Sequence, residues 1–190
     1  MPYLSGPDWL ARHVLTDRWV LAVAGTHGKT TTTAMLIDIL EEAGLDPTVL
    51  VGGVVRNLST NAKTGKGDFL VVEADEYDRT FHKLHPEIAV ITNIEADHLE
   101  YFGSFEAILE AFRIFVEGVK PGGAVVACID DPAVEQLFGA PVSSPARVIT
   151  YGLSESASLR ATNLQFSERG TTFDVPGMGS FDLPVHGEHN

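Results

Sequence analysis

The chain has 190 residues, which is enough for one well-packed domain with a small appended unit. Hydrophobic residues make up 44% of the sequence and charged residues 21%, which is typical of a soluble globular protein and not of a disordered chain. The formal net charge of −13 argues against nucleic acid or an anionic membrane as a partner, because both would be repelled.

The first part of the chain alternates apolar runs with amphipathic ones. A short helix is expected over Ser5–Val14, because Pro7 suits a first helical turn. The other elements expected here are a strand at Trp19–Ala24, a helix at Thr31–Ala43, and strands at Thr48–Val51 and Phe69–Glu73, with a polar loop at Asn57–Asp68.

The second part continues the alternation and then changes in texture. The elements expected first are strands at Ile88–Thr92, Ala124–Ile129 and Val148–Tyr151, and helices at Ser104–Val116 and Pro132–Phe138. From Ser158 onward, alternating segments at Leu159–Phe166, Thr171–Val175 and Phe181–Val185 predict antiparallel hairpins. The single cysteine, Cys128, lies in an apolar run, so we interpret it as a core thiol; without a second cysteine no internal disulfide can form, which fits a reducing compartment.

Continuous apolar strands that alternate with helices predict an α/β fold: a mostly parallel sheet with helices on both faces, and a small antiparallel subsheet at the C-terminal end. We divide the chain into a leading segment at 1–18, an α/β core at 19–152, and the subsheet with a closing segment at 153–190. Neither end carries a terminating element, so we interpret the chain as one domain of a longer protein. No membrane-spanning run or secretion signal is recognised, so we expect it in the cytoplasm.

The segment Val20–Thr33, VLAVAGTHGKTTTT, predicts a phosphate-binding loop. An apolar strand leads into the glycine turn at Gly25–Thr30, and a helical pattern follows, so backbone amides and the helix dipole would favour phosphate. Lys29 would reach the β- and γ-phosphates, and the Thr30 hydroxyl would hold Mg²⁺. The usual pattern would require glycine at the position of Val23, so this loop is shorter; a merely structural glycine turn is the alternative.

Two further positions meet this loop at the carboxyl edge of the predicted sheet, where α/β proteins bind ligands. Glu73 ends a strand and is well placed to bind Mg²⁺ on a triphosphate, whereas Asp75 and Glu76 are expected beside it or facing solvent. His98 follows the next strand. From spacing alone, an ordinary hydrogen-bonding role is favoured over a role as ligand of metal or phosphate, because hard cations prefer oxygen. Three other histidines are expected at the surface: His13, His82 and His85.

Read together, these segments resemble the Mur ligases, and specifically their central ATP-binding domain. The similarity covers nearly the whole chain in the right order, and the shortened loop is this family's own variant. The matching segments are Ala24–Thr32, Val51–Gly53, Thr60–Ala62, Glu73–Glu76, Thr92–His98 and Gly187–Asn190.

The resemblance implies an enzyme that uses ATP to join an amino acid or peptide to the carboxylate of a UDP-sugar through an acyl phosphate. It implies that Lys29 contacts the phosphates, that Thr30 and Glu73 hold one Mg²⁺, and that His98 binds a second Mg²⁺. Asn61 would face the UDP-sugar. The residues implied to bind ATP are Gly25, Thr26, His27, Gly28, Lys29, Thr30, Thr31, His189 and Asn190.

The resemblance leaves two branches open, both starting from UDP-N-acetylmuramate. One adds L-alanine; the other adds a recycled tripeptide, L-Ala-γ-D-Glu-meso-diaminopimelate. The openings Ser5–Leu10 and Trp19–Leu21 resemble the recycling branch. The compact Phe81–Pro86 and the motif Thr92–His98 resemble the L-alanine branch, which we favour. Phe105–Gly118 contains no lysine, which disfavours branches that carry a carbamylated lysine there.

The family enzymes also use a UDP-sugar domain before this one and an amino-acid-binding domain after it. We therefore expect the isolated domain to be inactive. A different class of function also remains open, in which the chain is a non-catalytic nucleotide-binding module.

Overall fold

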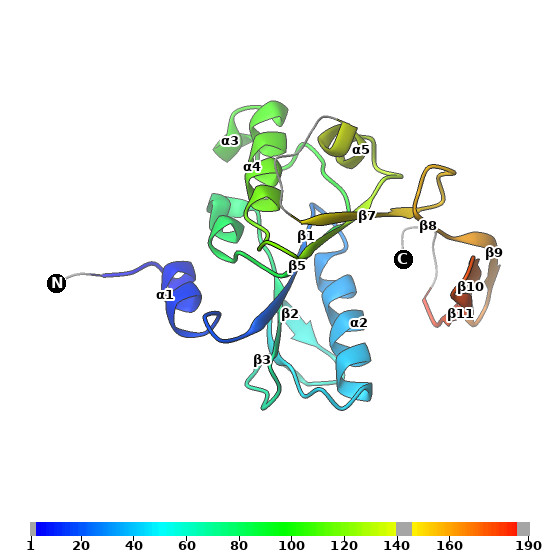
Figure 1. Ribbon diagram of the computed structural model, residues 1–190, viewed down its shortest axis with the longest axis horizontal. Coiled ribbons are helices and arrows are strands. Elements are labelled where there is room, and N and C mark those ends of the chain that lie inside the picture. Colours follow the sequence, from blue (N-terminus) through cyan, green and yellow to red (C-terminus); the bar gives the residue numbers. More distant parts are fainter. Residues whose placement is uncertain (1–2, 140–145, 186–190) are drawn as a thin grey trace.

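The structure is a computed structural model that describes residues 3–139 and 146–185. An eight-stranded sheet has the order β3-β2-β4-β1-β5-β6-β7-β8, and a separate three-stranded sheet has the order β11-β10-β9 (Figure 1). The strands are β1 Trp19–Ala24, β2 Thr48–Val55, β3 Thr60–Lys63, β4 Phe69–Glu73, β5 Ile88–Ile91, β6 Ala124–Cys128, β7 Arg147–Gly152, β8 Leu159–Arg160, β9 Thr162–Ser167, β10 Gly170–Val175 and β11 Gly179–Leu183. The helices are α1 Gly6–His13, α2 Lys29–Glu42, the 3₁₀-helix η1 Tyr77–Lys83, α3 Leu99–Phe102, α4 Phe105–Glu117 and α5 Pro132–Gly139.

The predicted α/β fold is confirmed. Every strand pair of the large sheet is parallel except β2–β3, and both pairs of the small sheet are antiparallel. Parallel strands need crossover connections, and here helices supply most of them. The parallel strands therefore bring the loops that follow β1, β4 and β5 to one edge.

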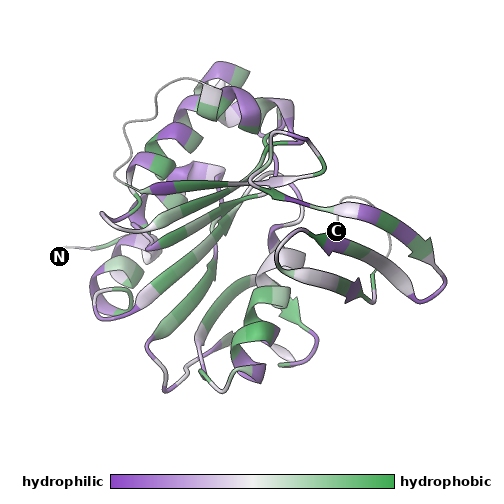
Figure 2. Cartoon of the chain, turned by 45° about the vertical axis from the view of Figure 1, so that its right-hand side comes forward, coloured by the Kyte–Doolittle hydropathy of each residue, from purple (hydrophilic) through white to green (hydrophobic). Residues whose placement is uncertain are grey.

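The strands of the large sheet bury both faces, which explains their unbroken apolar sequences. In β1, Val20 and Ala22 point to a core shared with α1, η1, α4 and α5, whereas Leu21 points to a second core with Ile37 of α2. Because side chains alternate across a strand, one apolar run serves two layers. Figure 2 shows these hydrophobic strands between the two helical layers, with the small sheet projecting to one side.

Several predicted boundaries shift, and one predicted loop is wrong. The expected hairpin segment Leu159–Phe166 is divided: Leu159–Arg160 forms β8, which pairs parallel with β7 in the large sheet, and only β9 belongs to the small sheet. Helix α2 begins at Lys29, two residues before the expected start, and β2 runs on to Val55. The segment expected to be a loop, Asn57–Asp68, contains β3, which pairs antiparallel with β2 at the edge of the sheet. Its polar sequence did not predict a strand because β3 joins the sheet by backbone hydrogen bonds and buries no side chain.

The segment between β4 and β5 also differs from expectation. It forms η1, in which Asp78 and Arg79 both adopt left-handed backbone angles. His82 was expected at the surface, but it is half-buried: its ring stacks on Phe81, and its Nε2 lies 2.8 Å from the Ala111 carbonyl oxygen. Burial lowers the pKa of His82, since a charged imidazole would lose hydration there.

Candidate functional site

The loop after β1 starts at a position that only glycine can occupy. Gly25 has φ of +139°, and a Cβ atom there would lie 2.0 Å from the Thr92 Oγ1 and 3.0 Å from the Asn93 carbonyl oxygen. The loop is thus pressed against the segment that follows β5. This close approach is the physical reason for the first glycine of the predicted phosphate loop.

Side chains and backbone of residues 92–95 hold the loop in place. The amides of Thr26 and His27 donate to the backbone oxygen and the side-chain Oδ1 of Asn93, at 3.0 and 2.8 Å. In return, the amide of Glu95 donates to Thr26 Oγ1 at 2.8 Å, and Thr92 Oγ1 donates to the His27 carbonyl at 2.7 Å. Thr26 and His27 therefore shape the loop through their contacts with the β5 edge.

Helix α2 begins where the loop ends, and it has no side-chain cap. Its N-cap is Gly28, in a left-handed conformation with φ of +80°. The first amides of an α-helix have no partner inside the helix, so those of Lys29, Thr30 and Thr31 are oriented as an anion-binding end. This arrangement matches the predicted strand–loop–helix setting.

The Lys29 ammonium is turned back onto its own loop. Its Nζ donates to the carbonyl oxygens of Gly25 at 2.6 Å and Thr26 at 3.2 Å, and it lies 2.9 Å from Glu76 Oε2 and 3.2 Å from Oε1. The ion pair is well shielded, because the Lys29 side chain is 15% exposed and the Glu76 side chain 4%. Glu76, expected beside the metal ligands or facing solvent, is instead a buried partner of Lys29.

Thr30 and Glu73 are brought together as predicted. The Thr30 hydroxyl lies 3.0 Å from each oxygen of the Glu73 carboxylate, and the amide of Gly52 donates to Glu73 Oε2 at 3.0 Å. Gly52 belongs to the irregular part of β2, and a Cβ atom on Gly53 would lie 3.4 Å from Thr30 Cγ2, so both glycines border the Thr30–Glu73 pair. A hydroxyl and a carboxylate side by side are oxygen donors of the kind that Mg²⁺ prefers.

His98 lies at the same edge of the sheet but makes a separate set of contacts. It caps α3 with φ of +53°, and its ring meets the Tyr77 ring edge-on at a centroid distance of 5.0 Å. Its Nδ1 is 3.6 Å from Glu100 Oε1, and its Nε2 is 3.9 Å from Asp97 Oδ2. Within residues 3–139 and 146–185, its contacts are with these neighbours and not with Glu73.

The remaining predicted residues lie apart from this centre or outside it. Asn61 is exposed on β3, opposite the irregular stretch of β2 that contains Gly52 and Gly53. His189 and Asn190 lie outside the described residues. In the described part of the chain, no three His, Cys, Asp or Glu side chains gather as a ready-made metal cage.

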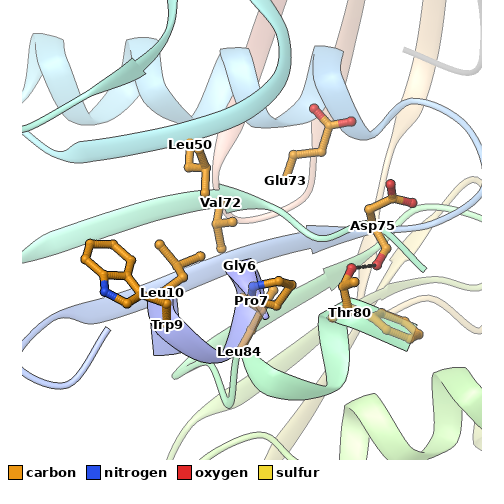
Figure 3. A pocket seen from close by; sticks show the side chains of 11 residues that line it. Gly6, Pro7, Trp9, Leu10, Leu50, Val72, Glu73, Asp75, Thr80 and Leu84 are labelled. Carbon is orange, nitrogen blue, oxygen red and sulfur yellow. Dashed lines mark hydrogen bonds between the residues drawn. The ribbon is translucent and has the colours of Figure 1, made fainter. Parts of the chain in front are cut away.

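A hollow of about 330 Å³ lies between α1 and the sheet, and Glu73 is one of its lining residues (Figure 3). Figure 3 shows Trp9, Leu10 and Leu50 along it, with Glu73 and Asp75 toward one end. Lys29 and Thr30 are not among its lining residues. The hollow therefore shares Glu73 with the site but does not include the loop at Gly25–Thr30.

Sequence reasoning missed Glu76 and the bracing by Thr92 and Asn93. The sequence offers one hint for Glu76: it lies three residues after Glu73, which β4 brings to the edge of the sheet. Its burial, however, depends on how η1 packs, which no local pattern reports.

None of the helices in the described part of the chain is both long and apolar enough to cross a membrane.

Comparison with known proteins adds to this geometry. Residues 23–190 match the family model of the Mur ligase middle domain. Relatives include UDP-N-acetylmuramate–L-alanine ligases of Parvibaculum lavamentivorans, 46% identical over all of this chain, and Rhodospirillum rubrum, 44% identical over 91% of it. The chain spans 40% and 38% of the lengths of these two relatives.

Solved structures of ligases that act on UDP-N-acetylmuramate also match the chain. A ligase of Neisseria meningitides, described as UDP-N-acetylmuramate:L-alanyl-gamma-D-glutamyl-meso-diaminopimelate ligase, has a TM-score of 0.86 and 34% identity over all of this chain and 63% of its own. UDP-N-acetylmuramate-alanine ligase of Thermotoga maritima has a TM-score of 0.78 and 28% identity over 97% of this chain and 40% of its own. The chain belongs to the Mur ligase family, of which it is a middle domain.

Proposed function

We propose that this chain is the ATP-binding domain of a cytoplasmic ligase that joins UDP-N-acetylmuramate to L-alanine. The observation that carries the proposal is the convergence of Lys29 and of the Thr30–Glu73 pair at the start of one helix. The relatives named above as L-alanine ligases support this choice of substrates.

The reaction proceeds in two steps. The carboxylate of the UDP-sugar attacks the γ-phosphorus of ATP and ADP leaves, which gives an acyl phosphate. The amine of L-alanine then attacks the acyl carbon, an amide bond forms, and phosphate leaves with a proton released. Lys29 and the first amides of α2 would offset the phosphate charge in the first step, because both lie at the uncapped start of α2.

Mg²⁺ would be held by Thr30 and Glu73, and it would supply positive charge to the phosphate oxygens during transfer. A second Mg²⁺ would be held by His98, and it would supply positive charge for the acceptor carboxylate. Imidazole is a poor ligand for Mg²⁺, so this site should accept Mn²⁺ at least as well. Anomalous diffraction from a crystal of the full-length enzyme, with Mn²⁺, a non-hydrolysable ATP analogue and the UDP-sugar, tests the assignment. The absence of an anomalous Mn²⁺ peak in contact with the His98 imidazole would contradict the assignment.

Nucleotide binding is tested first. Lys29→Ala removes a charged donor, and such hydrogen bonds contribute roughly 1.5–3 kcal/mol, so we expect at least about a tenfold loss in ATP affinity by calorimetry. Lys120→Ala is a matched control: Lys120 also pairs with a shielded glutamate, Glu87, at 2.6 Å, but it lies at the opposite ends of the strands. Equal ATP affinities for the unaltered chain and Lys29→Ala would show that Lys29 does not contact the nucleotide.

Enzyme and binding module are separated by restoring the flanking domains. For a ligase, phosphate release should then require UDP-N-acetylmuramate, while the isolated domain hydrolyses ATP very slowly. Fast ATP turnover by the isolated domain would instead indicate a free-standing ATPase. Tight ATP binding without turnover in the restored protein would indicate a nucleotide-binding module.

A second candidate substrate is the tripeptide L-Ala-γ-D-Glu-meso-diaminopimelate. It is favoured by the similarity to the N. meningitides ligase, which has the higher TM-score of the two structures described. The restored enzyme decides between the two when it is offered L-alanine and the tripeptide separately, with amide product measured for each.

A further inference from the structure

Glu76 is a charged side chain that the proposed reaction does not use. Its side chain is 4% exposed, and its partner is the ammonium of Lys29. A carboxylate is costly to bury unless a positive charge compensates it, and Lys29 provides that charge here. The following inference rests on the proposed function, because it concerns the same nucleotide site.

Lys29 has no proton to spare in this arrangement. An ammonium has three donors, and they face two loop carbonyls and the Glu76 carboxylate, all within 3.2 Å. A phosphate can therefore bind Lys29 only if one of these acceptors gives way. Of the three, only Glu76 carries a negative charge.

The position of Glu76 sets it against a bound nucleotide. A phosphate oxygen in contact with Lys29 Nζ would lie within a few ångströms of the Glu76 carboxylate, in a site shielded from water. Like charges so close repel strongly where the effective dielectric constant is low. Carboxylate and phosphate thus compete for one ammonium.

We propose that Glu76 is the counter-ion of Lys29 and competes with nucleotide for it: the carboxylate gives up the ammonium to the β- and γ-phosphates of a nucleoside triphosphate. Glu76 thereby stabilises the fold through its ion pair and lowers the affinity of the domain for nucleotide. A residue with a purely structural role would act differently, because its loss would weaken folding and binding together.

The test is Glu76→Gln, which keeps the side-chain shape and removes the charge. In calorimetry with ATP and Mg²⁺, we expect at least a tenfold gain in affinity, equivalent to about 1.4 kcal/mol. In the absence of nucleotide, the same variant should unfold at a lower temperature than the unaltered chain, since Lys29 then has no counter-ion. The two measurements should move in opposite directions.

Glu87→Gln is the matched control. Glu87 is a similarly shielded partner of a lysine, with 15% of its side chain exposed, but it precedes β5 at the far end of the sheet. It also accepts from the Val20 amide, so its loss should lower the unfolding temperature. Its ATP affinity should match that of the unaltered chain.

The double variant Lys29→Ala/Glu76→Gln shows whether Glu76 acts through Lys29. We expect a smaller gain in ATP affinity from Glu76→Gln in the Lys29→Ala background, because only the direct repulsion between Glu76 and phosphate is then removed and no ammonium is released. An unchanged or weaker affinity in the single variant, or the same gain in both backgrounds, would overturn the proposal. If Glu76→Gln does not fold, Glu76→Asp lengthens the ion pair and should tighten ATP binding less; no tightening would again overturn it.

Failure of the proposed function has a different signature. If the unaltered chain and Lys29→Ala bind ATP equally well, or neither binds it, the nucleotide site itself is wrong and the inference falls with it. If Lys29→Ala weakens binding but Glu76→Gln does not strengthen it, the site stands and only the counter-ion role is wrong.

Discussion

The two sheets of this chain are stabilised in different ways. The large sheet is covered on both faces, and residues such as Val20, Val71 and Ala89 are fully buried within it. The three-stranded sheet carries its apolar side chains near solvent: Phe166 is 53% exposed, and Phe181 stacks on Phe173 at 5.5 Å. The small sheet thus depends chiefly on its backbone ladder and one aromatic pair.

This difference explains where a precise site can be built. Groups that must meet within tenths of an ångström need strands that cannot shift, and two-sided burial fixes the register of β1, β4 and β5. The loop at Gly25–Thr30 follows β1, Glu73 ends β4, and His98 lies after β5. The small sheet offers no comparable support, and none of the predicted site residues in the described ranges lies on it.

The difference in packing between the two sheets is tested most strongly by replacing one phenylalanine with alanine in each: Phe112 of α4, which packs on the large sheet, and Phe181 of the small sheet. Phe112 of α4 is completely buried and meets Phe81 edge-on at 5.3 Å. Phe112→Ala removes the ring and leaves a cavity, so we expect a loss of about 3–5 kcal/mol in the free energy of unfolding. Denaturant titration followed by circular dichroism measures it.

Phe181→Ala is the counterpart in the small sheet. Since Phe181 is 38% exposed, we expect a loss of less than about 1.5 kcal/mol, which covers the stacked pair and partial burial. Equal losses at Phe112 and Phe181 would show that the two sheets are equally well packed, contrary to the comparison.

Glycine positions sharpen the contrast. Gly25→Ala should strain the backbone and force the loop away from Thr92 and Asn93, at a cost on the order of 1–3 kcal/mol and with loss of ATP binding. Gly177, in the turn between β10 and β11, also has a positive φ but has open space around it. Gly177→Ala should cost no more than about 1–2 kcal/mol and leave ATP binding unchanged. A loop variant that binds ATP normally would contradict the role given to Gly25.

A smaller effect is expected at the start of α4, which covers the large sheet. The Ser104 hydroxyl accepts from the Ala107 amide at 3.2 Å, and Ser104→Ala should cost about 1 kcal/mol in the free energy of unfolding. Ser104→Asp restores an acceptor and should recover most of the loss. No change on Ser104→Ala would mean that packing alone holds this end of the helix.

The smallest effect is a pH dependence that originates in the large sheet's helical layer. The pKa of His82 is lowered by burial in the folded chain, and Arg79, Lys83 and His85 lower it further. Between the folded pKa and the unfolded value of 6.5, the unfolded chain binds more protons, so stability rises with pH. This contribution is present above about pH 6.5 and lost as pH falls below it.

His82→Gln should flatten that part of the curve when unfolding is measured from pH 7.5 down to pH 5. His13→Gln is the control, because His13 is exposed on α1. If the slope is the same in both variants, the titrating group is not His82.

Much of the fold follows from local sequence because burial on two faces leaves a plain signature. Continuous apolar runs predicted β1 and β4, and the glycines after β1 predicted a turn between a strand and a helix. β3 could not be predicted in this way, since it joins the sheet through its backbone and its side chains are polar.

The site was predictable only where a residue ends a strand or lies at the start of the helix that the strand leads into. Thr30 and Glu73 meet as predicted because the ends of parallel strands share one edge. The burial of Glu76 results from the path of η1, including the left-handed Asp78 and Arg79, and that path depends on packing against α1 and α4. Long-range packing of this kind has no periodic signal in the sequence.

The ends of the large sheet have a consequence for how the protein behaves at high concentration. An open sheet edge can pair with another chain and begin aggregation. Here one edge is β3, four residues long, where Lys63 lies 2.5 Å from Glu41 and 2.7 Å from Asp46; the other is β8, two residues long. Short edges, one of them carrying a fixed charge, disfavour intermolecular strand pairing at both margins of the sheet.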